Sequence, residues 1–168
     1  MLKLYKVVNK MDFEIISVEP KDKNKLYNLL QFTLYDSTQY IDKDIDENCC
    51  FEYKWFENYF TDNNRNAYFI RSSDKYIGMV MVNENLKFNK TGKCIAEFLI
   101  LPKYRRKHIG KKVAFKIFDK FKGDWEVQPM ENNPTAYAFW KNIITEYTNN
   151  SYVIKNDGIE DVFIFKNN

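Results

Sequence analysis

The stretch CIAEFLILPKYRRKHIGKKVAFKIFDKF, residues 94–121, decides how the rest of the sequence is interpreted. Its first eight residues, Cys94 to Leu101, form an apolar run rich in Ile and Leu that contains one acid, Glu97. A run of this kind is typical of a strand that is buried on both faces. Pro102 ends the run, because a proline cannot donate the backbone hydrogen bond that a central strand requires.

A basic turn follows this predicted strand and leads into a helix. Seven Lys or Arg residues and no acid lie between Lys103 and Lys116. Apolar residues then recur at helical spacing, with lysines on the opposite face; they are Ile109, Val113, Ile117, Phe118 and Phe121. The first N–H groups of a helix have no partner within it, and the helix dipole favours an anion there. The pattern therefore predicts a phosphate-binding turn; a solvated helix start with a chance basic cluster is the alternative.

The turn sequence LPKYRRKHIGKKV, residues 101–113, resembles motif A of the GNAT superfamily of N-acetyltransferases, [Q/R]-x-x-G-x-[G/A]. Arg105 matches the first position and Gly110 the last, whereas His108 replaces the middle glycine. The resemblance implies that the loop wraps the pyrophosphate of acetyl-coenzyme A, mostly through backbone amides. The cofactor contacts that it implies are Leu99, Ile100, Leu101, Arg105, Arg106, Lys107, His108, Ile109, Gly110 and Lys111. Because histidine is tolerated at positive φ, we expect the turn to persist, with His108 crowding or contacting the phosphate.

A second motif lies in MENNPTAYAFWKNII, residues 130–144. Asn133 is a good N-cap and Pro134 occupies the favoured first helical position, so a helix is predicted from there. Its apolar stripe consists of Ala136, Phe139, Trp140, Ile143 and Ile144. The segment resembles the GNAT pattern N-x-x-A-x-x-[FL]-[YW], which implies that Asn133 contacts the cofactor and that the helix, with Trp140, packs near the cofactor's sulfur.

The remaining pattern predicts a mixed α/β fold in one domain spanning residues 1–168. Strands are predicted at 13–18, 67–71, 76–82, 125–129, 147–155 and 160–166 in addition to 94–101. Helices are predicted from about residue 21, with Leu26, Leu29, Leu30, Thr33 and Leu34 on a buried face, and over about 51–60. The resemblance implies a GNAT-like, mostly antiparallel sheet of about six to seven strands flanked by about four helices.

Composition restricts the function classes. Hydrophobic residues make up 45% of the 168 residues and the net charge is +3, which argues against disorder and against a dedicated nucleic-acid binder. The start of the sequence has no signal-peptide pattern, and no run approaches the ~20 apolar residues of a membrane helix. Three cysteines and one histidine predict reduced thiols and no metal site. We therefore expect a cytoplasmic protein without membrane or nucleic-acid partners; a homodimer is compatible with the sequence.

The reaction that the resemblance implies is direct transfer of an acetyl group from acetyl-CoA to a primary amine. An alkylammonium group has a pKa of about 10.4, so a base must take its proton. Glu97 is the candidate base, because burial in an apolar strand raises the pKa of a carboxyl group; a solvated or lysine-paired acid is the alternative. Tyr137 is the candidate acid, because Trp140 stands where the family often has a tyrosine; a reaction without an acid, or a packing role for Tyr137, is the alternative.

Residues 35–62 carry eight acids and two lysines. Acids such as Asp36, Asp42 or Asp46 could attract a cationic amine, or the segment could be a solvated loop. The acceptor itself, a small-molecule amine or a protein amine, is left open. A coenzyme A-binding module without catalysis is a further alternative, suggested by the two departures from the family pattern at His108 and Trp140.

Overall fold

In the computed structural model of the protein, residues 12–167 are described. The strands are β1 (Glu14–Ser17), β2 (Asn66–Ser72), β3 (Lys75–Asn83), β4 (Lys93–Ile100), β5 (Gly123–Val127), β6 (Val153–Asn156) and β7 (Asp161–Asn167). The helices are α1 (Lys23–Ser37), α2 (Asn58–Thr61), α3 (Ile109–Lys120) and α4 (Pro134–Thr148), with short 3-10 turns η1 (Pro20–Asp22) and η2 (Pro102–Tyr104). The inference about a signal peptide concerns mainly residues 1–11, which lie outside this range. None of the helices within residues 12–167 is long and apolar enough to cross a membrane.

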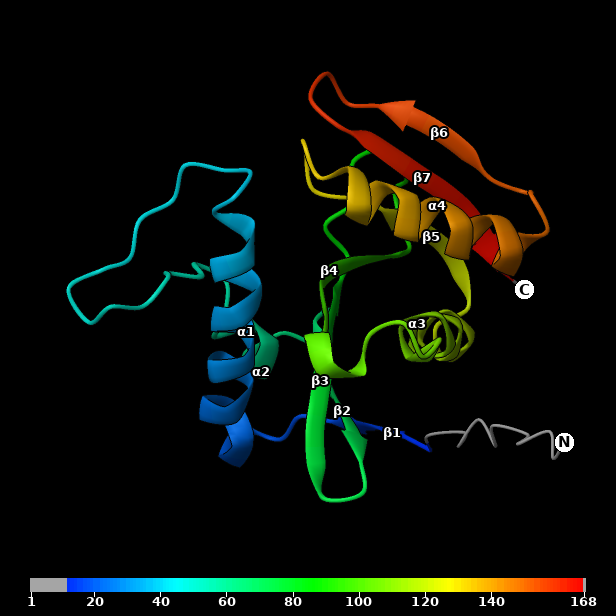
Figure 1. Cartoon of the computed structure of the whole chain (residues 1–168). Helices are drawn as coiled ribbons and strands as arrows, with labels where there is room; N and C mark the ends of the chain where they lie inside the picture. The colour runs from blue at the N-terminus through cyan, green and yellow to red at the C-terminus, as the bar shows by residue number, and fades with distance from the viewer. Residues whose placement is uncertain (1–11, 168) are drawn as a thin grey trace, which may run out of the picture.

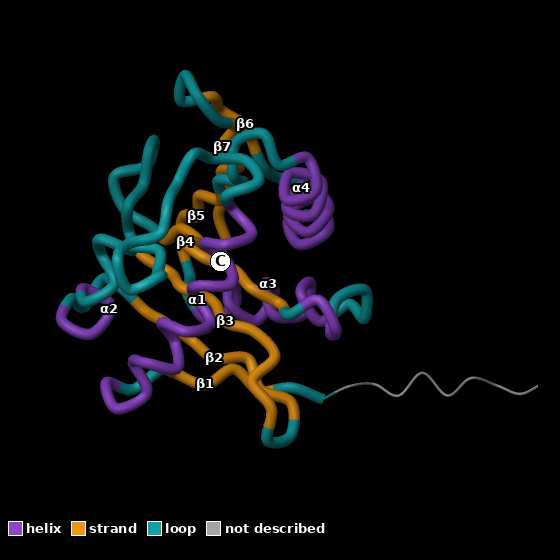
Figure 2. Tube along the Cα trace, turned by 60° about the vertical axis from the view of Figure 1, so that its left-hand side comes forward, coloured by secondary structure: helices purple, strands orange, loops and turns teal. Residues whose placement is uncertain are grey.

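The seven strands form one sheet in the order β1-β2-β3-β4-β5-β7-β6. Every neighbouring pair is antiparallel except β4 and β5, which are parallel. Helices α1 and α2 cover one face of the sheet, and α3 and α4 cover the other (Figures 1 and 2). The predicted mixed, mostly antiparallel sheet with four helices is therefore confirmed.

The parallel pair β4–β5 is short and then opens. The two strands pair only at Lys93↔Trp125 and Cys94↔Glu126, so residues 95–100 of β4 have no partner on β5. On its other side β4 follows β3 along its whole length, with a bulge at Ala96, because Met81 and Val82 face Glu97 and Ile95. The separation of β4 and β5 leaves main-chain groups of β4 without a partner on β5 in the middle of the sheet.

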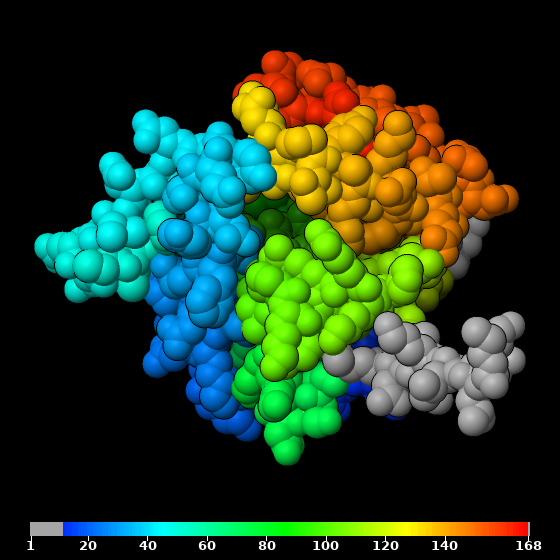
Figure 3. Space-filling model, in the orientation of Figure 1, coloured from blue at the N-terminus to red at the C-terminus, as the bar shows by residue number. Residues whose placement is uncertain are grey.

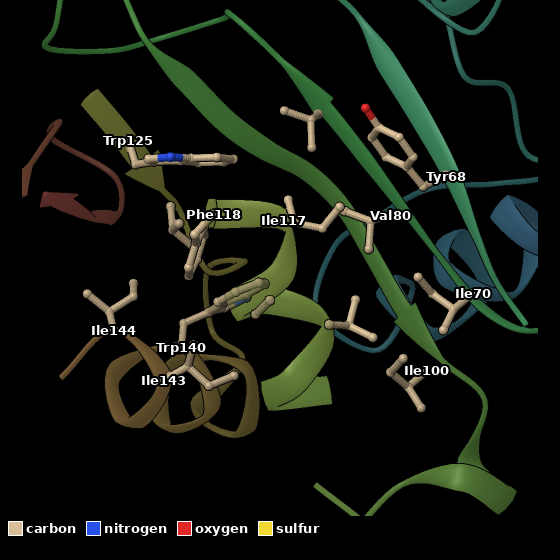
Figure 4. Packing of buried hydrophobic residues seen from close by; sticks show 14 of the residues in the cluster. Tyr68, Ile70, Val80, Ile100, Ile117, Phe118, Trp125, Trp140, Ile143 and Ile144 are labelled. Carbon is tan, nitrogen blue, oxygen red and sulfur yellow. The ribbon is translucent and has the colours of Figure 1, made fainter. Parts of the chain in front are cut away.

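Two apolar clusters hold the layers together. The larger lies between the sheet and helices α3 and α4; Figure 4 shows Trp125 and Phe118 next to Trp140, Ile143 and Ile144. The smaller lies on the α1 side and contains Leu26, Leu30, Met79, Met81 and Leu99. Each fully buried large side chain contributes about 1.5–3 kcal/mol relative to an exposed one, so both faces of β3 and β4 are fixed by packing.

Three sequence predictions were wrong in detail. The helix predicted over 51–60 is reduced to α2, because Phe51 is held in an irregular segment by the Gln31 side chain: Gln31 Nε2 donates to the Phe51 carbonyl (3.1 Å) and the Phe51 N–H donates to Gln31 Oε1 (2.7 Å). The strand predicted from Tyr147 begins only at Val153, because α4 continues to Thr148 and is stopped by Asn149 in the left-handed region. Strand β4 is only partly buried over residues 93–98, because β5 diverges from it.

Candidate functional site

A hollow lies where three segments distant in the sequence approach one another. Figure 3 shows it between the blue helix α1, the green chain that enters α3 and the yellow start of α4, with dark green chain at its bottom. Figure 1 places β4 behind this region. The hollow therefore opens onto the part of the sheet where β4 and β5 separate.

The turn from η2 into α3 presents a row of free backbone donors. Arg106 (φ 59°) and His108 (φ 57°) both adopt the left-handed conformation, which curls the chain before α3 starts. Within the described residues, the N–H groups of residues 106–111 donate to no backbone or side-chain acceptor. A histidine at positive φ is thus accommodated, as the sequence predicted, and the turn offers several N–H groups to one anion.

The Arg105 side chain, unlike those of its neighbours in the turn, bonds to β4 and to α1. Its Nε donates to the Ile100 carbonyl at 2.7 Å, and its Nη2 lies 3.6 Å from Asp36 Oδ2 on α1. The side chain thereby ties the turn to the end of β4 and to α1. Asp36 is therefore paired with Arg105. The acids that could bind a cationic acceptor are then those within residues 38–57.

The other basic residues of the turn differ in how far they are engaged. Lys111 Nζ bonds both oxygens of Glu146 on α4, at 2.7 and 3.0 Å. Lys107 Nζ lies 5.9 Å from the centre of the Tyr104 ring. Arg106, Lys107 and His108 are exposed and form no ion pair with the described residues. The free positive charge of the turn therefore comes from Arg106 and Lys107, together with Lys103.

Gly110 lies close to α4. A Cβ atom at Gly110 would lie 3.1 Å from two ring atoms of Phe139 on α4. The glycine thus lets the first turn of α3 approach α4 closely, which fixes the turn relative to the start of that helix. The resemblance implied a cofactor contact at Gly110 and gave no indication of this packing.

The residues of the second motif occupy three different environments. Asn133 Oδ1 accepts the N–H of Ala136 at 2.9 Å, so the side chain caps α4 and keeps only its amide nitrogen for another partner. Trp140 is 6% exposed and packs against Phe98, with 5.0 Å between ring centres. The Tyr137 hydroxyl donates to Asp161 Oδ2 at 3.3 Å, and burial together with the Asp161 charge raises the pKa of Tyr137.

Glu97 faces the opposite side of the sheet. Its cross-strand partner Met81 belongs to the cluster on the α1 side, and paired residues of a ladder share one face. Burial raises the pKa of Glu97 from its ordinary 4.5 to about 7, against the opposing effects of a hydrogen bond from Tyr53 and the charge of Lys43. The structure therefore places a carboxyl group with a near-neutral pKa beside the bulge of β4.

A polar network behind Glu97 was missed by sequence reasoning. The Asn83 amide nitrogen donates to the Tyr59 hydroxyl at 3.2 Å, and Cys94 Sγ donates to Asn83 Oδ1 at 2.7 Å. Burial raises the pKa of the Cys94 thiol to about 11 and that of the Tyr53 phenol still further. These groups come from β3, β4 and the 50–61 segment, so only the strand register and an irregular loop bring them together, and neither has a sequence signature.

A polar cavity of about 300 Å³ lies next to this network. Its lining combines side chains of β3, β4, β5 and β7 with the connection after β3: Asn83, Asn85, Lys87, Cys94, Ile95, Ala96, Glu126, Gln128, Glu160 and Val162. Glu126 is 2% exposed and accepts the N–H groups of residues 87, 88 and 89 at 2.6, 3.0 and 2.7 Å. This carboxylate thus fixes the connection that forms the cavity wall, another feature that the sequence did not indicate.

The structure brings together part of the predicted constellation. The turn, the end of β4 and the start of α4 surround one hollow, whereas Trp140 lies in the core beneath it. Glu97 and Tyr137 are on different sides of the sheet, since Tyr137 packs with the cluster of the α3–α4 side. Any chemistry that uses both groups must therefore take place in the opening between β4 and β5.

Comparisons with known proteins agree with this architecture. An acetyltransferase from Thermus thermophilus has a TM-score of 0.67 at 13% identity, over 92% of this chain and 97% of that chain. The PaiA N-acetyltransferase of Thermoplasma acidophilum, solved in complex with coenzyme A, has a TM-score of 0.62 at 15% identity, over 94% and 100%. The spermidine N-acetyltransferase of Vibrio cholerae, solved with CoA and spermine, has a TM-score of 0.59 at 13% identity, over 90% and 92%.

The family is shown by sequence as well as by fold. Comparison with curated protein sequences gives no match. Residues 24–143, however, match the sequence profile of the Acetyltransferase (GNAT) family, and this range includes β4, the basic turn, α3 and most of α4. The chain belongs to the acetyltransferase (GNAT) family.

Proposed function

We propose that this protein transfers an acetyl group from acetyl-CoA directly to a primary amine of an acceptor bound on the Glu97 side of the sheet. The observation that carries the proposal is the row of free N–H groups at residues 106–111, placed where β4 and β5 separate. Acetyl-CoA supplies an activated thioester carbonyl. The same turn would hold its pyrophosphate, and the opening in the sheet would admit the thioester end.

The turn is suited to a pyrophosphate for electrostatic reasons. Backbone N–H groups at a helix start bind an anion without the entropy cost of ordering long side chains. Arg106, Lys107 and Lys103 add positive charge at the rim of the turn, whereas Arg105 and Lys111 are engaged with Asp36 and Glu146. We therefore propose that Arg106, Lys107 and Lys103 attract the phosphates at long range. Arg105 and Lys111 would shape the turn.

Glu97 is the proposed base. Only a deprotonated amine has the electron pair that attacks a carbonyl, and most alkylamines are protonated at neutral pH. A carboxyl group whose pKa is about 7 is partly ionised there and is a stronger base than an ordinary glutamate. Proton removal by Glu97, directly or through one water, is the step that the chain itself contributes.

The leaving thiolate of coenzyme A depends less on a proton donor than the attacking amine depends on a base. A thiol has a pKa of about 8.5, so the thiolate is a good leaving group. Tyr137 is a weak donor, because its pKa is raised and its hydroxyl already donates to Asp161. We therefore propose that the thiolate leaves without a proton from Tyr137, whose main role is to hold α4 against β7. The Leu101 N–H already donates to the Ile77 carbonyl at 2.9 Å, so the proposed donor to the charge that develops on the carbonyl oxygen is the N–H of Ile100, the alternate residue, which points away from β3.

The acceptor is proposed to use the cavity beside Asn83. Its amide, carboxylate and lysine groups favour a polar acceptor over an apolar one, and its volume of about 300 Å³ is at the lower end for ligand sites. Either a small polar amine or the N-terminal residues of a polypeptide fit this description. The structural neighbours named above do not narrow the choice, because their likeness extends to the fold alone.

The test combines binding with turnover on the full chain. Calorimetric titration with CoA should give one site per chain, and acetyl-CoA with a panel of polar primary amines should release free thiol faster than acetyl-CoA alone. Absence of CoA binding at millimolar concentration would contradict the proposal. CoA binding without thiol release for any amine would favour the non-catalytic module, for which the buried Trp140 and the engaged Tyr137 are the supporting observations.

A further inference from the structure

We propose that the carboxylates of Asp157 and Glu160 form a subsite for a second positively charged nitrogen of the acceptor, and that the Lys87 ammonium group occupies this subsite in the free protein. The acceptor class is then a small linear amine with two amino groups, one of which reacts. This inference rests on the proposed function, because it places the acceptor in the cavity beside Asn83. The subsite residues lie outside both sequence motifs.

An ion pair joins two elements of the cavity wall. The Nζ atom of Lys87, on the connection after β3, lies 3.0 Å from Oδ2 of Asp157, in the turn between β6 and β7. Lys87 and Glu160 both line the cavity. Asp157 contacts two of the lining residues, Lys87 and Gln128. The wall of the cavity therefore already binds one ammonium group, which the chain itself supplies.

The two carboxylates are held in place by backbone and amide donors. Asp157 Oδ1 accepts the N–H groups of Ile159 and Glu160, both at 2.9 Å. Glu160 Oε1 accepts the N–H of Glu131 at 2.9 Å. Its Oε2 accepts the Gln128 amide, which also reaches Asp157 Oδ2 at 3.5 Å. Because each carboxylate oxygen has two acceptor positions, both groups keep their orientation while an ammonium group is exchanged at the remaining positions.

Partial exposure of the ion pair allows this exchange. The Lys87 side chain is 49% exposed and that of Asp157 is 12% exposed. Exposed ion pairs contribute little stability, so an ammonium group of the acceptor can replace that of Lys87 at small cost. The N–H group of Glu160 and the charge of Lys87 lower the pKa of Asp157 to about 2, which keeps this carboxylate ionised at neutral pH.

The surroundings of the subsite are negatively charged. A second cavity, of about 480 Å³, adjoins Glu160 and is lined by the acids Glu131, Glu160 and Asp161. Among the described residues, Lys87 is the one basic residue in the lining of either cavity. Lys155 of β6 is nearby, with its Nζ 5.2 Å from the centre of the Phe88 ring. A positively charged end of the acceptor is therefore favoured here over a neutral or negative one.

The arrangement of strands sets the distance between the two nitrogens. One end of the cavity lies at Ala96 on β4, next to Glu97, and the other lies at Glu160, which precedes β7. Strand β5 lies between β4 and β7. Since strands in a sheet are about 4.8 Å apart, β4 and β7 are roughly 10 Å apart. An extended chain of about six to eight carbons between two amino groups covers this distance.

The test compares kcat/KM for 1,6-diaminohexane with that for 1-aminoheptane, in which a methyl group replaces the second ammonium group. Wild type should prefer the diamine by at least about tenfold. Asp157→Asn keeps the acceptor atom for the two N–H groups but removes the charge, so it should lower this preference about tenfold. Lys87→Met removes the competing ammonium group and should raise the preference about threefold. Lys90→Met, at an exposed lysine of the same connection, is the control and should leave it within about twofold.

The opposite signs of the two effects distinguish a ligand subsite from a structural ion pair. If Lys87→Met lowers the preference as Asp157→Asn does, the pair only shapes the cavity wall and the subsite is overturned. Equal kcat/KM for the two amines in wild type, or a preference that Asp157→Asn leaves unchanged, also overturns the subsite and leaves acetyl transfer standing. Should Asp157→Asn not fold, the sign of the Lys87→Met effect decides. If wild type releases thiol with no primary amine, the proposed function fails and the subsite fails with it.

Discussion

Replacing Glu97 by Gln tests the electrostatics of the site without any assumption about catalysis. The pKa of Glu97 is about 7 in the folded protein against an ordinary 4.5. Because the folded state holds this proton more tightly, the associated stability is fully present below pH 4.5 and is lost as the pH rises through about 7. A difference of this size corresponds to about 3 kcal/mol of unfolding free energy. Glutamine keeps the shape of the protonated acid and cannot ionise.

The assay is urea unfolding of both proteins between pH 5 and pH 8.5. The stability of Glu97→Gln relative to wild type should increase by about 2–3 kcal/mol over this range, since all other groups titrate in both proteins and cancel in the difference. Glu52→Gln, an exposed acid on the neighbouring segment, controls for the loss of one negative charge. A Glu97→Gln difference that stays constant within about 0.5 kcal/mol across the range would refute the assignment of a buried, proton-holding carboxyl group.

Three further substitutions test the turn and the starts of α3 and α4. His108→Gly restores the family pattern at a left-handed position and should change CoA affinity by no more than about tenfold in isothermal titration; complete loss of binding would make the imidazole a principal ligand. Gly110→Val should lower the unfolding free energy by about 1–3 kcal/mol in urea, because its branched side chain would have to fit where a single Cβ already lies 3.1 Å from two ring atoms of Phe139, and a stability equal to wild type would contradict that packing. Asn133→Ala should destabilise α4 by about 1 kcal/mol through loss of the cap to the Ala136 N–H, and an added loss of CoA affinity beyond this would show that the free amide nitrogen also contacts the ligand.

Much of the fold could be predicted because local signals and burial agree. The run 94–101 became β4 and the periodic helix became α3; Asn133 and Pro134 started α4 where the cap rule places them. The errors occur where tertiary contacts override local pattern. The aromatic residues of 51–60 resemble a helix face, yet Gln31 on α1 holds Phe51 in an extended turn.

The site could be predicted only as far as it is continuous in the sequence. The turn at 105–111 and the acid in β4 lie within one stretch, and their chemistry follows from residue type and order. The contact of Tyr59 with Asn83 depends on how the segment before β2 crosses the sheet, and the Asn83–Cys94 contact depends on the register of β3 and β4. Likewise, a periodic stripe on α4 predicts that Trp140 packs, but only the structure shows that Phe98 and Phe118 enclose it.

The central claim is that backbone N–H groups of the turn hold the pyrophosphate of coenzyme A, and amide NMR of the full chain during titration with CoA tests it most directly. The largest shift changes should fall on the amides of residues 106–111, with smaller changes at 99–101 and 133, and inorganic pyrophosphate alone should perturb the turn but not residues 99–101. Changes centred elsewhere on the protein, or saturable CoA binding that leaves the amides of 106–111 unperturbed, would contradict it.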